Sequence, residues 1–188
     1  IDRFKNIRKI INNDKIKLEY FISLINKLSE LDYNIVVRPH PEEDFKIYKD
    51  SFNLKENIFI TNDRSVVPWI IGCETMIHSD CTTGIESLML GKESIAFVPN
   101  RLDRDFLTSL PLQASKVINS EVQVLNYIKK KKYNKNVNFS NYPWLKNNFN
   151  YPGKSFNIIS DFLEKIELKT NYESITFTEI VLKNIKNK

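Results

Sequence analysis

The sequence predicts an α/β protein whose strands form an open parallel sheet with helices on both faces. Short apolar runs alternate with segments of helical periodicity through residues 15–131. The strand candidates are continuous apolar runs, as in 34–38 (NIVVR) and 94–98 (SIAFV), and do not alternate apolar with polar residues. Such runs are typical of strands buried on both faces, which occur in parallel sheets between two layers of helices.

Length and composition indicate a globular chain with a substantial core. The chain has 188 residues, of which 41% are hydrophobic and 27% charged. This apolar content is too high for a disordered chain, and the length suits one domain or one lobe of a larger protein. No run approaches the roughly 18 apolar residues of a membrane-spanning helix. Two cysteines fit a reducing compartment, and residues 1–17 lack the apolar run of a signal peptide, so we expect a cytoplasmic protein.

The net charge of +5 raises the question of a nucleic-acid or anionic-lipid partner. The chain is rich in Ile, Asn and Lys and has only two alanines, a skew that is typical of nucleotide bias in the coding genome. Its one dense basic run, 129–132, follows the apolar face of a predicted helix, where lysines complement the helix dipole. We therefore favour a solvated helix end over a binding patch, and we expect no nucleic-acid partner.

The first predicted elements are a helix and two strands. Residues 15–31 place apolar side chains at helical spacing after Asn13 or Asp14, either of which can cap a helix. Residues 34–38 form a β-branched run before a proline, which indicates a buried strand. Residues 57–61 (NIFIT) repeat that pattern.

Between these two strands the sequence predicts the start of a second helix. Pro41 is followed by Glu42 and Glu43. Proline is tolerated at the first helical position, and acidic side chains favour the positive end of the helix dipole. We therefore expect the first helical turn at residues 41–43.

The remaining elements continue the alternation. We expect helices at 65–73 and 82–90, the latter ending at Gly91 because glycine favours the position after a helix. We expect strands at 75–78 and 94–98, an edge strand at 117–119, a helix at 121–131, an irregular stretch at 133–152, and further helices at 155–167 and 178–186.

Both histidines of the chain follow predicted strands. Open parallel sheets bind ligands beyond the carboxyl ends of their strands. His40 lies in the run Arg38-Pro39-His40-Pro41 after the first strand, and His78 closes the third strand. The two prolines restrict the backbone around His40, and an Arg and a His before a helix suit an anion site. The alternatives are a stiff turn with a solvated His40 and a structural role for His78.

The segment Thr82-Thr83-Gly84-Ile85-Glu86 opens a helix after the third strand. Small hydroxyl residues and a glycine leave the first amides open, so a phosphate can accept from amides and hydroxyls together. The alternative is a helix cap at Thr82 or Thr83, with Glu86 completing a capping box. The chain contains neither a glycine-rich dinucleotide fingerprint nor a P-loop, and no Gly-x-Ser-x-Gly elbow surrounds Ser79.

Two motifs, RPHP at 38–41 and SDCTTGIESLMLGK at 79–92, resemble the C-terminal lobe of GT-B glycosyltransferases. The likeness is to bacterial surface- and capsule-polysaccharide enzymes, including capsule Kdo transferases and sialyltransferases, and it covers about residues 33–100. A similar pattern occurs in CDP-glycerol phosphotransferases. In this family a His-Pro motif and a Ser/Thr pair hold the phosphate of a CMP-activated sugar. The resemblance implies a Rossmann-like lobe, a nucleotide-sugar donor with CMP favoured, and a glycan or glycolipid acceptor.

The resemblance also implies roles for individual residues. His40 and the hydroxyls of Thr82 and Thr83 would neutralise the growing charge on the donor phosphate, so that no metal or other cofactor is required. His78 would line the phosphate pocket and act with His40 in catalysis. Glu86 would bind the ribose. The remaining expected nucleotide-binding residues are Arg38, Pro41, Ser79 and Gly84.

For domain organisation, we expect residues 1–188 to form one nucleotide-sugar-binding lobe. Its core covers about 15–131, with a C-terminal helical extension at about 153–188. A GT-B enzyme needs a second lobe, so we expect an N-terminal lobe that this chain lacks, and peripheral association with the inner membrane stays open. The alternatives are a CDP-glycerol phosphotransferase or UDP-sugar epimerase lobe, or a non-catalytic module that binds a protein or carbohydrate.

Overall fold

The structure, a computed structural model, describes residues 3–31, 33–52, 55–63, 65–130, 137, 141–144, 157 and 161. The chain divides into two compact units, Ile1–Trp144 and Leu145–Lys188. The helices and strands described here belong to the first unit. The helical extension expected at 153–188 falls outside the described residues, except for Asn157 and Asp161, and most of the irregular stretch expected at 133–152 does as well.

The first unit is a mixed α/β structure with two small parallel sheets. In one, β1 (Ile35–Val37) pairs with β2 (Ile58–Ile60); in the other, β4 (Ser94–Phe97) lies between β3 (Met76–His78) and β5 (Lys116–Ile118). Each of the five predicted strands is confirmed to within two residues at either end. The single open sheet expected from the sequence is not confirmed, because the ladder of hydrogen bonds is divided into these two sheets.

Helix α1 (Arg3–Ser29) has 27 residues and begins well before the predicted start at 15. Its first half was not predicted because it carries little of the apolar face that marks a buried helix. Ile7 and Ile11 there are 50% and 60% exposed. Asn13, which the sequence suggested as a cap, lies inside the helix, and its side chain contacts the backbone of Asp103 instead. Asn13 is of a residue type that often caps helices, but here it does not mark the start of α1.

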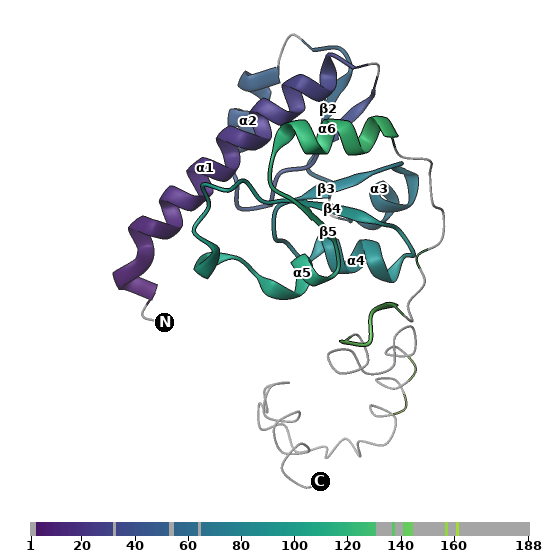
Figure 1. Cartoon of the computed structure of the whole chain (residues 1–188). Helices are drawn as coiled ribbons and strands as arrows, with labels where there is room; N and C mark the ends of the chain where they lie inside the picture. The colour runs from purple at the N-terminus through teal and green to yellow at the C-terminus, as the bar shows by residue number, and fades with distance from the viewer. Residues whose placement is uncertain are drawn as a thin grey trace, which may run out of the picture. The chain divides into compact units, whose positions relative to one another are not determined.

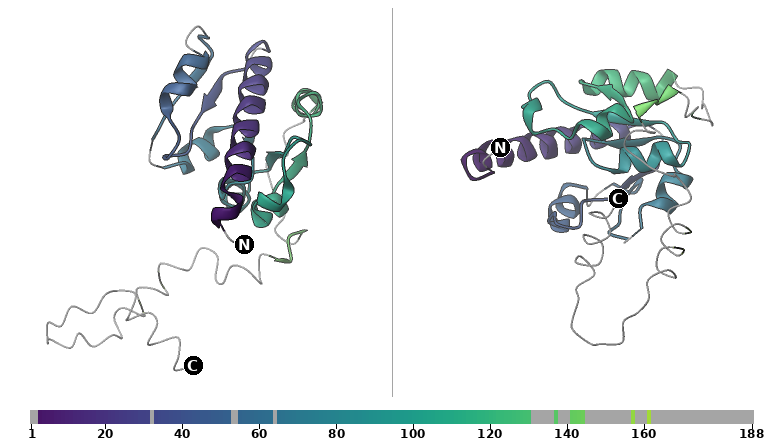
Figure 2. Two further views of the ribbon diagram at one scale, coloured as in Figure 1. Left: turned by 90° about the vertical axis from the view of Figure 1, so that its left-hand side faces the viewer. Right: turned by 90° about the horizontal axis from the view of Figure 1, so that it is seen from below.

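The C-terminal half of α1 packs against both sheets. Leu24 and Leu28 join a core cluster with residues of β4, β5 and α6 (Glu121–Lys130), and Ile25 joins a second cluster with β1, β2 and α2 (Phe45–Phe52). In the left view of Figure 2, α1 runs between the blue α2 region and the strands of the three-stranded sheet. The buried members of the first cluster are Leu24, Leu28, Ile95, Phe97, Ile118 and Val124, and those of the second are Ile25, Val37, Tyr48, Phe52 and Ile58.

Helices cover both faces of the three-stranded sheet (Figure 1). The face opposite α1 and α6 is covered by α4 (Thr83–Met89) and α5 (Ser109–Gln113), while α3 (Val67–Gly72) connects β2 to β3. All four residues of β4 are buried. This explains the uninterrupted apolar run at 94–98, since a central strand between two helical layers has no solvent-facing side.

The end of α4 matches the prediction at Gly91. Gly91 has φ +72°, in the left-handed region that glycine adopts without steric cost. Its amide donates to Leu88 O (2.9 Å) and the Lys92 amide donates to Ser87 O (2.8 Å). These two hydrogen bonds form a Schellman motif, which satisfies carbonyls at the end of the helix.

Candidate functional site

The turn after β1 holds His40 by hydrogen bonds to its own backbone neighbourhood. The His40 amide donates to Glu43 Oε2 (2.7 Å), and the Glu42 amide donates to His40 Nδ1 (3.3 Å). Residues 41–43 form a turn and α2 begins only at Phe45, so the first helical turn predicted at 41–43 was wrong. The Glu43 carboxylate, which the sequence pattern placed in a helix, satisfies the amide of His40 instead.

These contacts select the tautomer of the exposed His40 ring. Because Nδ1 accepts a hydrogen bond, its lone pair is engaged, and a neutral imidazole must carry its proton on Nε2. Nε2–H is then a donor on the part of the ring that the turn does not use. A ring held in this way can donate to a phosphate oxygen without first changing its protonation.

Arg38 connects the turn after β1 to the segment after β2. Its Nε and Nη2 both donate to the carbonyl oxygen of Asp63, at 3.1 and 2.5 Å. The contact holds the two strand-end segments together. Sequence reasoning assigned Arg38 to an anion site together with His40. The nucleotide-binding role of Arg38, and that of the exposed Pro41, stay predictions.

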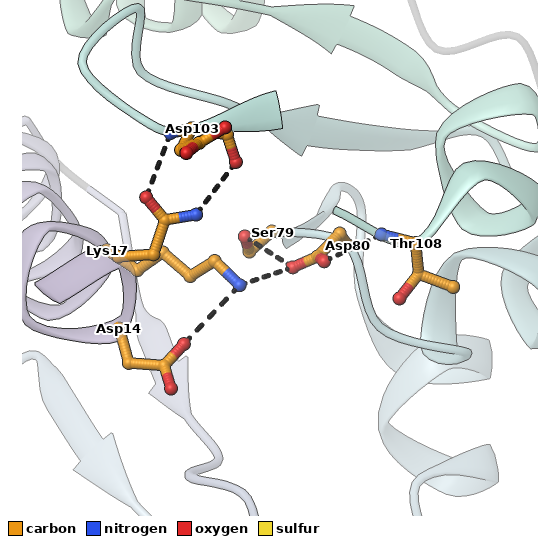
Figure 3. A network of polar contacts seen from close by, with 7 residues as sticks. Asp14, Lys17, Ser79, Asp80, Asp103 and Thr108 are labelled. Atoms are coloured by element: carbon orange, nitrogen blue, oxygen red, sulfur yellow. Dashed lines mark hydrogen bonds and ion pairs between the residues drawn. The ribbon is translucent and has the colours of Figure 1, made fainter. Parts of the chain in front are cut away.

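Asp80, directly after β3, is the centre of a network that joins three parts of the fold (Figure 3). Its Oδ1 accepts from Lys17 Nζ on α1 and from Ser79 Oγ, both at 2.9 Å, and its Oδ2 accepts from the Thr108 amide at 3.0 Å. Lys17 also lies 3.6 Å from the exposed carboxylate of Asp14. The network fixes the segment that leads into Thr82 and Thr83.

The electrostatics of Asp80 favour its charged form. Burial raises the pKa of its carboxyl group, but the hydrogen bonds from Lys17, Thr108 and Ser79, together with the Lys17 charge, lower it below its ordinary value. The side chains of Lys17 and Asp80 are only 20% and 12% exposed. The Ser79 hydroxyl donates to Asp80, and the nucleotide-binding role that sequence reasoning assigned to Ser79 stays a prediction.

His78 is 5% exposed and belongs to a buried chain of polar side chains. Its Nε2 lies 2.7 Å from Ser115 Oγ, which also contacts Ser94 Oγ and donates to the Pro111 carbonyl, both at 2.8 Å. Because the single hydroxyl proton of Ser115 goes to Pro111, Ser115 must accept from both other partners. His78 therefore carries its proton on Nε2, and Nδ1 is a buried atom without a hydrogen-bond partner in the described part of the chain.

Helix α4 lies directly against the His78 ring. A β-carbon on Gly84 would stand 2.5 Å from His78 Nε2 and 2.7 Å from Ser115 Oγ, so only glycine fits this first turn. Burial lowers the pKa of His78 to about 4, against the opposing effect of the Asp80 charge. The structure thus shows His78 as a neutral packing residue, which is the structural alternative to a catalytic histidine, and its catalytic role stays a prediction.

Thr82 occupies the N-cap position of α4, as one alternative expected, but its side chain does not cap the helix. Thr82 has helical backbone angles (φ −58°, ψ −18°) and makes no side-chain capping hydrogen bond. Its carbonyl accepts from the amides of Ile85 and Glu86, so the backbone alone starts the helix. Within the described ranges, neither threonine hydroxyl makes a hydrogen bond. Glu86 lies half-buried in the first turn of α4, and its ribose contact stays a prediction.

The structure groups the predicted residues into two sets. Arg38, His40 and Pro41 follow β1, and Ser79 to Glu86 follow β3, each after the carboxyl end of a parallel strand. Among the described residues, no hydrogen bond or ion pair joins the two sets. Sequence reasoning missed the residues that hold the second set, because no local pattern links them to it: Lys17, Ser94, Thr108 and Ser115.

Comparisons with protein-family models, with curated proteins and with solved structures each found no match. Within the described part of the chain, no group of three or more His, Cys, Asp or Glu side chains is placed to hold a metal ion. In those same ranges, no helix has both the length and the apolar character that crossing a membrane requires.

Proposed function

We propose that this chain is the donor-binding lobe of a glycosyltransferase that uses a nucleotide-activated sugar, with a CMP-sugar favoured, in bacterial surface polysaccharide biosynthesis. The observation that carries the proposal is the pair of hydroxyl groups on Thr82 and Thr83 at the start of α4, of which that of Thr82 makes no capping hydrogen bond. Two rigid contacts hold this segment, through Asp80 on one side and Gly84 on the other. Hydroxyls and amides at such a turn can bind phosphate oxygens together.

His40 supports the same proposal from the turn after β1. Its Nδ1 accepts a hydrogen bond from the Glu42 amide, so its Nε2–H is the group that can donate to a phosphate oxygen. A second donor on a separate segment suits a ligand that lies across the ends of the strands, as ligands of parallel sheets do.

In the proposed reaction, an acceptor hydroxyl forms a bond to the anomeric carbon of the sugar, and the bond from that carbon to the phosphate oxygen breaks. The nucleotide leaves with the bonding electrons, so negative charge grows on its phosphate. Donors fixed before the reaction stabilise that charge, by about 3 kcal/mol each in comparable oxyanion holes. The proton of the acceptor hydroxyl passes to a base outside this lobe, on the second lobe that we also propose.

Calorimetry of nucleotide binding tests the proposal. We expect the wild-type chain to bind CMP more tightly than CDP, UMP or UDP. Thr83→Val and His40→Ala should each weaken CMP binding about tenfold, because each removes one donor to a charged phosphate. Thr75→Val is the matched control, since Thr75 lies immediately before the opposite end of β3 and should leave binding unchanged.

Two results would contradict the proposal: no binding of any of the four nucleotides, or equal weakening by Thr75→Val and Thr83→Val. A clear preference for CDP would instead support the CDP-glycerol phosphotransferase alternative, and a preference for UDP would support the epimerase lobe.

A further inference from the structure

A groove lies between the N-terminal half of α1 and the segment that follows β4. Its volume is about 310 Å³, which is at the lower end of the range for small-molecule sites, about 300–1,000 Å³. Four of its lining residues come from α1 and two from the segment after β4: Arg8, Lys9, Asn12, Asn13, Arg101 and Asp103.

The groove carries an excess of positive charge. Its lining residues include three cations, Arg8, Lys9 and Arg101, and one carboxylate, that of Asp103. Asp103 has a structural role, because its Oδ1 accepts from the Asp105 amide and caps the short helix η1 (Arg104–Phe106). The three cations, in contrast, make no ion pair or hydrogen bond with the described residues. The charge of the groove is therefore not balanced by its own walls.

The two walls of the groove are held together before any ligand arrives. Asn13 is 2% exposed, and its Nδ2 donates to Asp103 O while its Oδ1 accepts from the Asp103 amide, both at 2.9 Å. Leu102, beside Arg101, is 5% exposed and packs in a cluster with Ala96 and Val98. Arg101 is thus carried by a segment that is anchored both to α1 and to the core.

The two cations of α1, Arg8 and Lys9, lie on the same face of the helix as Asn13, which binds the backbone of Asp103. Arg8 is four residues before Asn12 and Lys9 is four residues before Asn13, so each lies one turn away on the same face of the helix. Lys17 lies four residues after Asn13, one turn further along α1, and is not among the residues that line the groove. The groove therefore borders the segment that Lys17 and Asp80 hold without including either residue.

We propose that this groove binds a phosphate-bearing small molecule through Arg8, Lys9 and Arg101. Guanidinium groups bind phosphate oxygens through two parallel hydrogen bonds, and the Asn12 amide offers a further donor. The fixed walls reduce the ordering cost of binding. The volume suits one small ligand. This proposal does not depend on the nucleotide-sugar function, because it uses none of the residues that follow β1 or β3.

A calorimetric titration of the full chain with inorganic pyrophosphate, at low salt, tests whether the groove binds phosphate groups. We expect saturable binding, and the double variant Arg8→Ala/Arg101→Ala, which removes two charge-assisted contacts, should weaken it about tenfold or more. The matched control is Lys129→Ala/Lys130→Ala, which changes the net charge equally at the exposed end of α6. Circular dichroism of both double variants checks that each is folded.

Further variants distinguish binding in the groove from binding elsewhere on the chain. Arg8→Lys/Arg101→Lys keeps the charge but loses the planar fork, so it should bind more weakly than wild type and more tightly than the alanine double variant. Because the proposed nucleotide site also binds phosphate, the alanine double variant is also measured in a Thr83→Val background, where Arg8→Ala/Arg101→Ala should still weaken pyrophosphate binding about tenfold. The proposal is overturned if pyrophosphate does not saturate, if the Lys129/Lys130 control loses as much affinity, or if Arg8→Ala/Arg101→Ala loses no affinity in the Thr83→Val background.

Discussion

Gly84 stands so close to the imidazole of His78 that a β-carbon at this position would lie 2.5 Å from Nε2. This contact connects a buried strand end to the first turn of α4, and it sets the distance at which Thr82 and Thr83 are held from the sheet. The ring cannot move aside cheaply, because Ser115 holds its Nε2 and the ring is 5% exposed.

We therefore expect Gly84→Ala to destabilise the chain. The added methyl group overlaps His78 and Ser115, and overpacking of this kind costs typically about 1–3 kcal/mol. Urea denaturation measures the loss. The control is Gly72→Ala at the end of α3, where a β-carbon meets nothing within 4 Å. That variant should be neutral or more stable, because alanine is the better helix former by about 1 kcal/mol. Equal losses in both variants would contradict a steric cause.

The Lys17–Asp80 contact should contribute to stability through both partners. Asp80→Asn removes the negative charge that accepts hydrogen bonds from Lys17 and from the Thr108 amide. Because these partly buried donors lose a charged acceptor, the free energy of unfolding should fall by about 1–3 kcal/mol. Lys17→Met should cost a similar amount. The double variant should lose less than the sum, because both substitutions break the same contact. Denaturation of the four proteins measures the coupling, and strict additivity would contradict it. Lys15→Met, an exposed neighbour, is the control.

The same carboxylate predicts a dependence of stability on pH. The pKa of Asp80 is lowered in the folded chain, so the unfolded chain binds this proton more readily. Its contribution is therefore complete above the ordinary pKa of an aspartate and is lost as the pH falls through the lower folded pKa. Relative to Asp80→Asn, the wild type should lose its advantage only in that acidic range. An advantage that shrank between about pH 7 and 9 instead, far above any aspartate pKa, would contradict the prediction.

His78 should titrate far below an ordinary histidine. Its pKa is lowered to about 4 from 6.5 by burial, so between these values the unfolded chain binds a proton that the folded chain does not. Stability should therefore fall as the pH drops from 6.5 to 4, by about 1.4 kcal/mol per unit from this group. Proton NMR of the ring measures the titration directly, and His40→Gln assigns the signal, since the chain has two histidines. A His78 signal that is charged at about pH 6 would contradict the structure.

Local patterns predicted the strands well, because a strand that is buried on both faces is a continuous apolar run of only a few residues. Residues 94–98 were predicted as a strand, and β4 covers Ser94–Phe97 with every residue buried. The same local reasoning was wrong at Pro41–Glu43, since an acidic side chain after a proline serves a turn as well as a helix. It also missed the first half of α1, where the apolar face is replaced by the polar residues of the groove.

By itself, the sequence determined the parallel class of the sheets, the end of α4 at Gly91 and the order of helices and strands except for η1 and α5, which were not predicted. Only the tertiary structure decided which polar side chains form hydrogen bonds with one another. His78 contacts Ser115 across 37 positions, Lys17 contacts Asp80 across 63, and Asn13 contacts Asp103 across 90. It also decided that the strands divide into two sheets. Such contacts form only when packing of the core brings distant segments together, and no pattern along the chain records them.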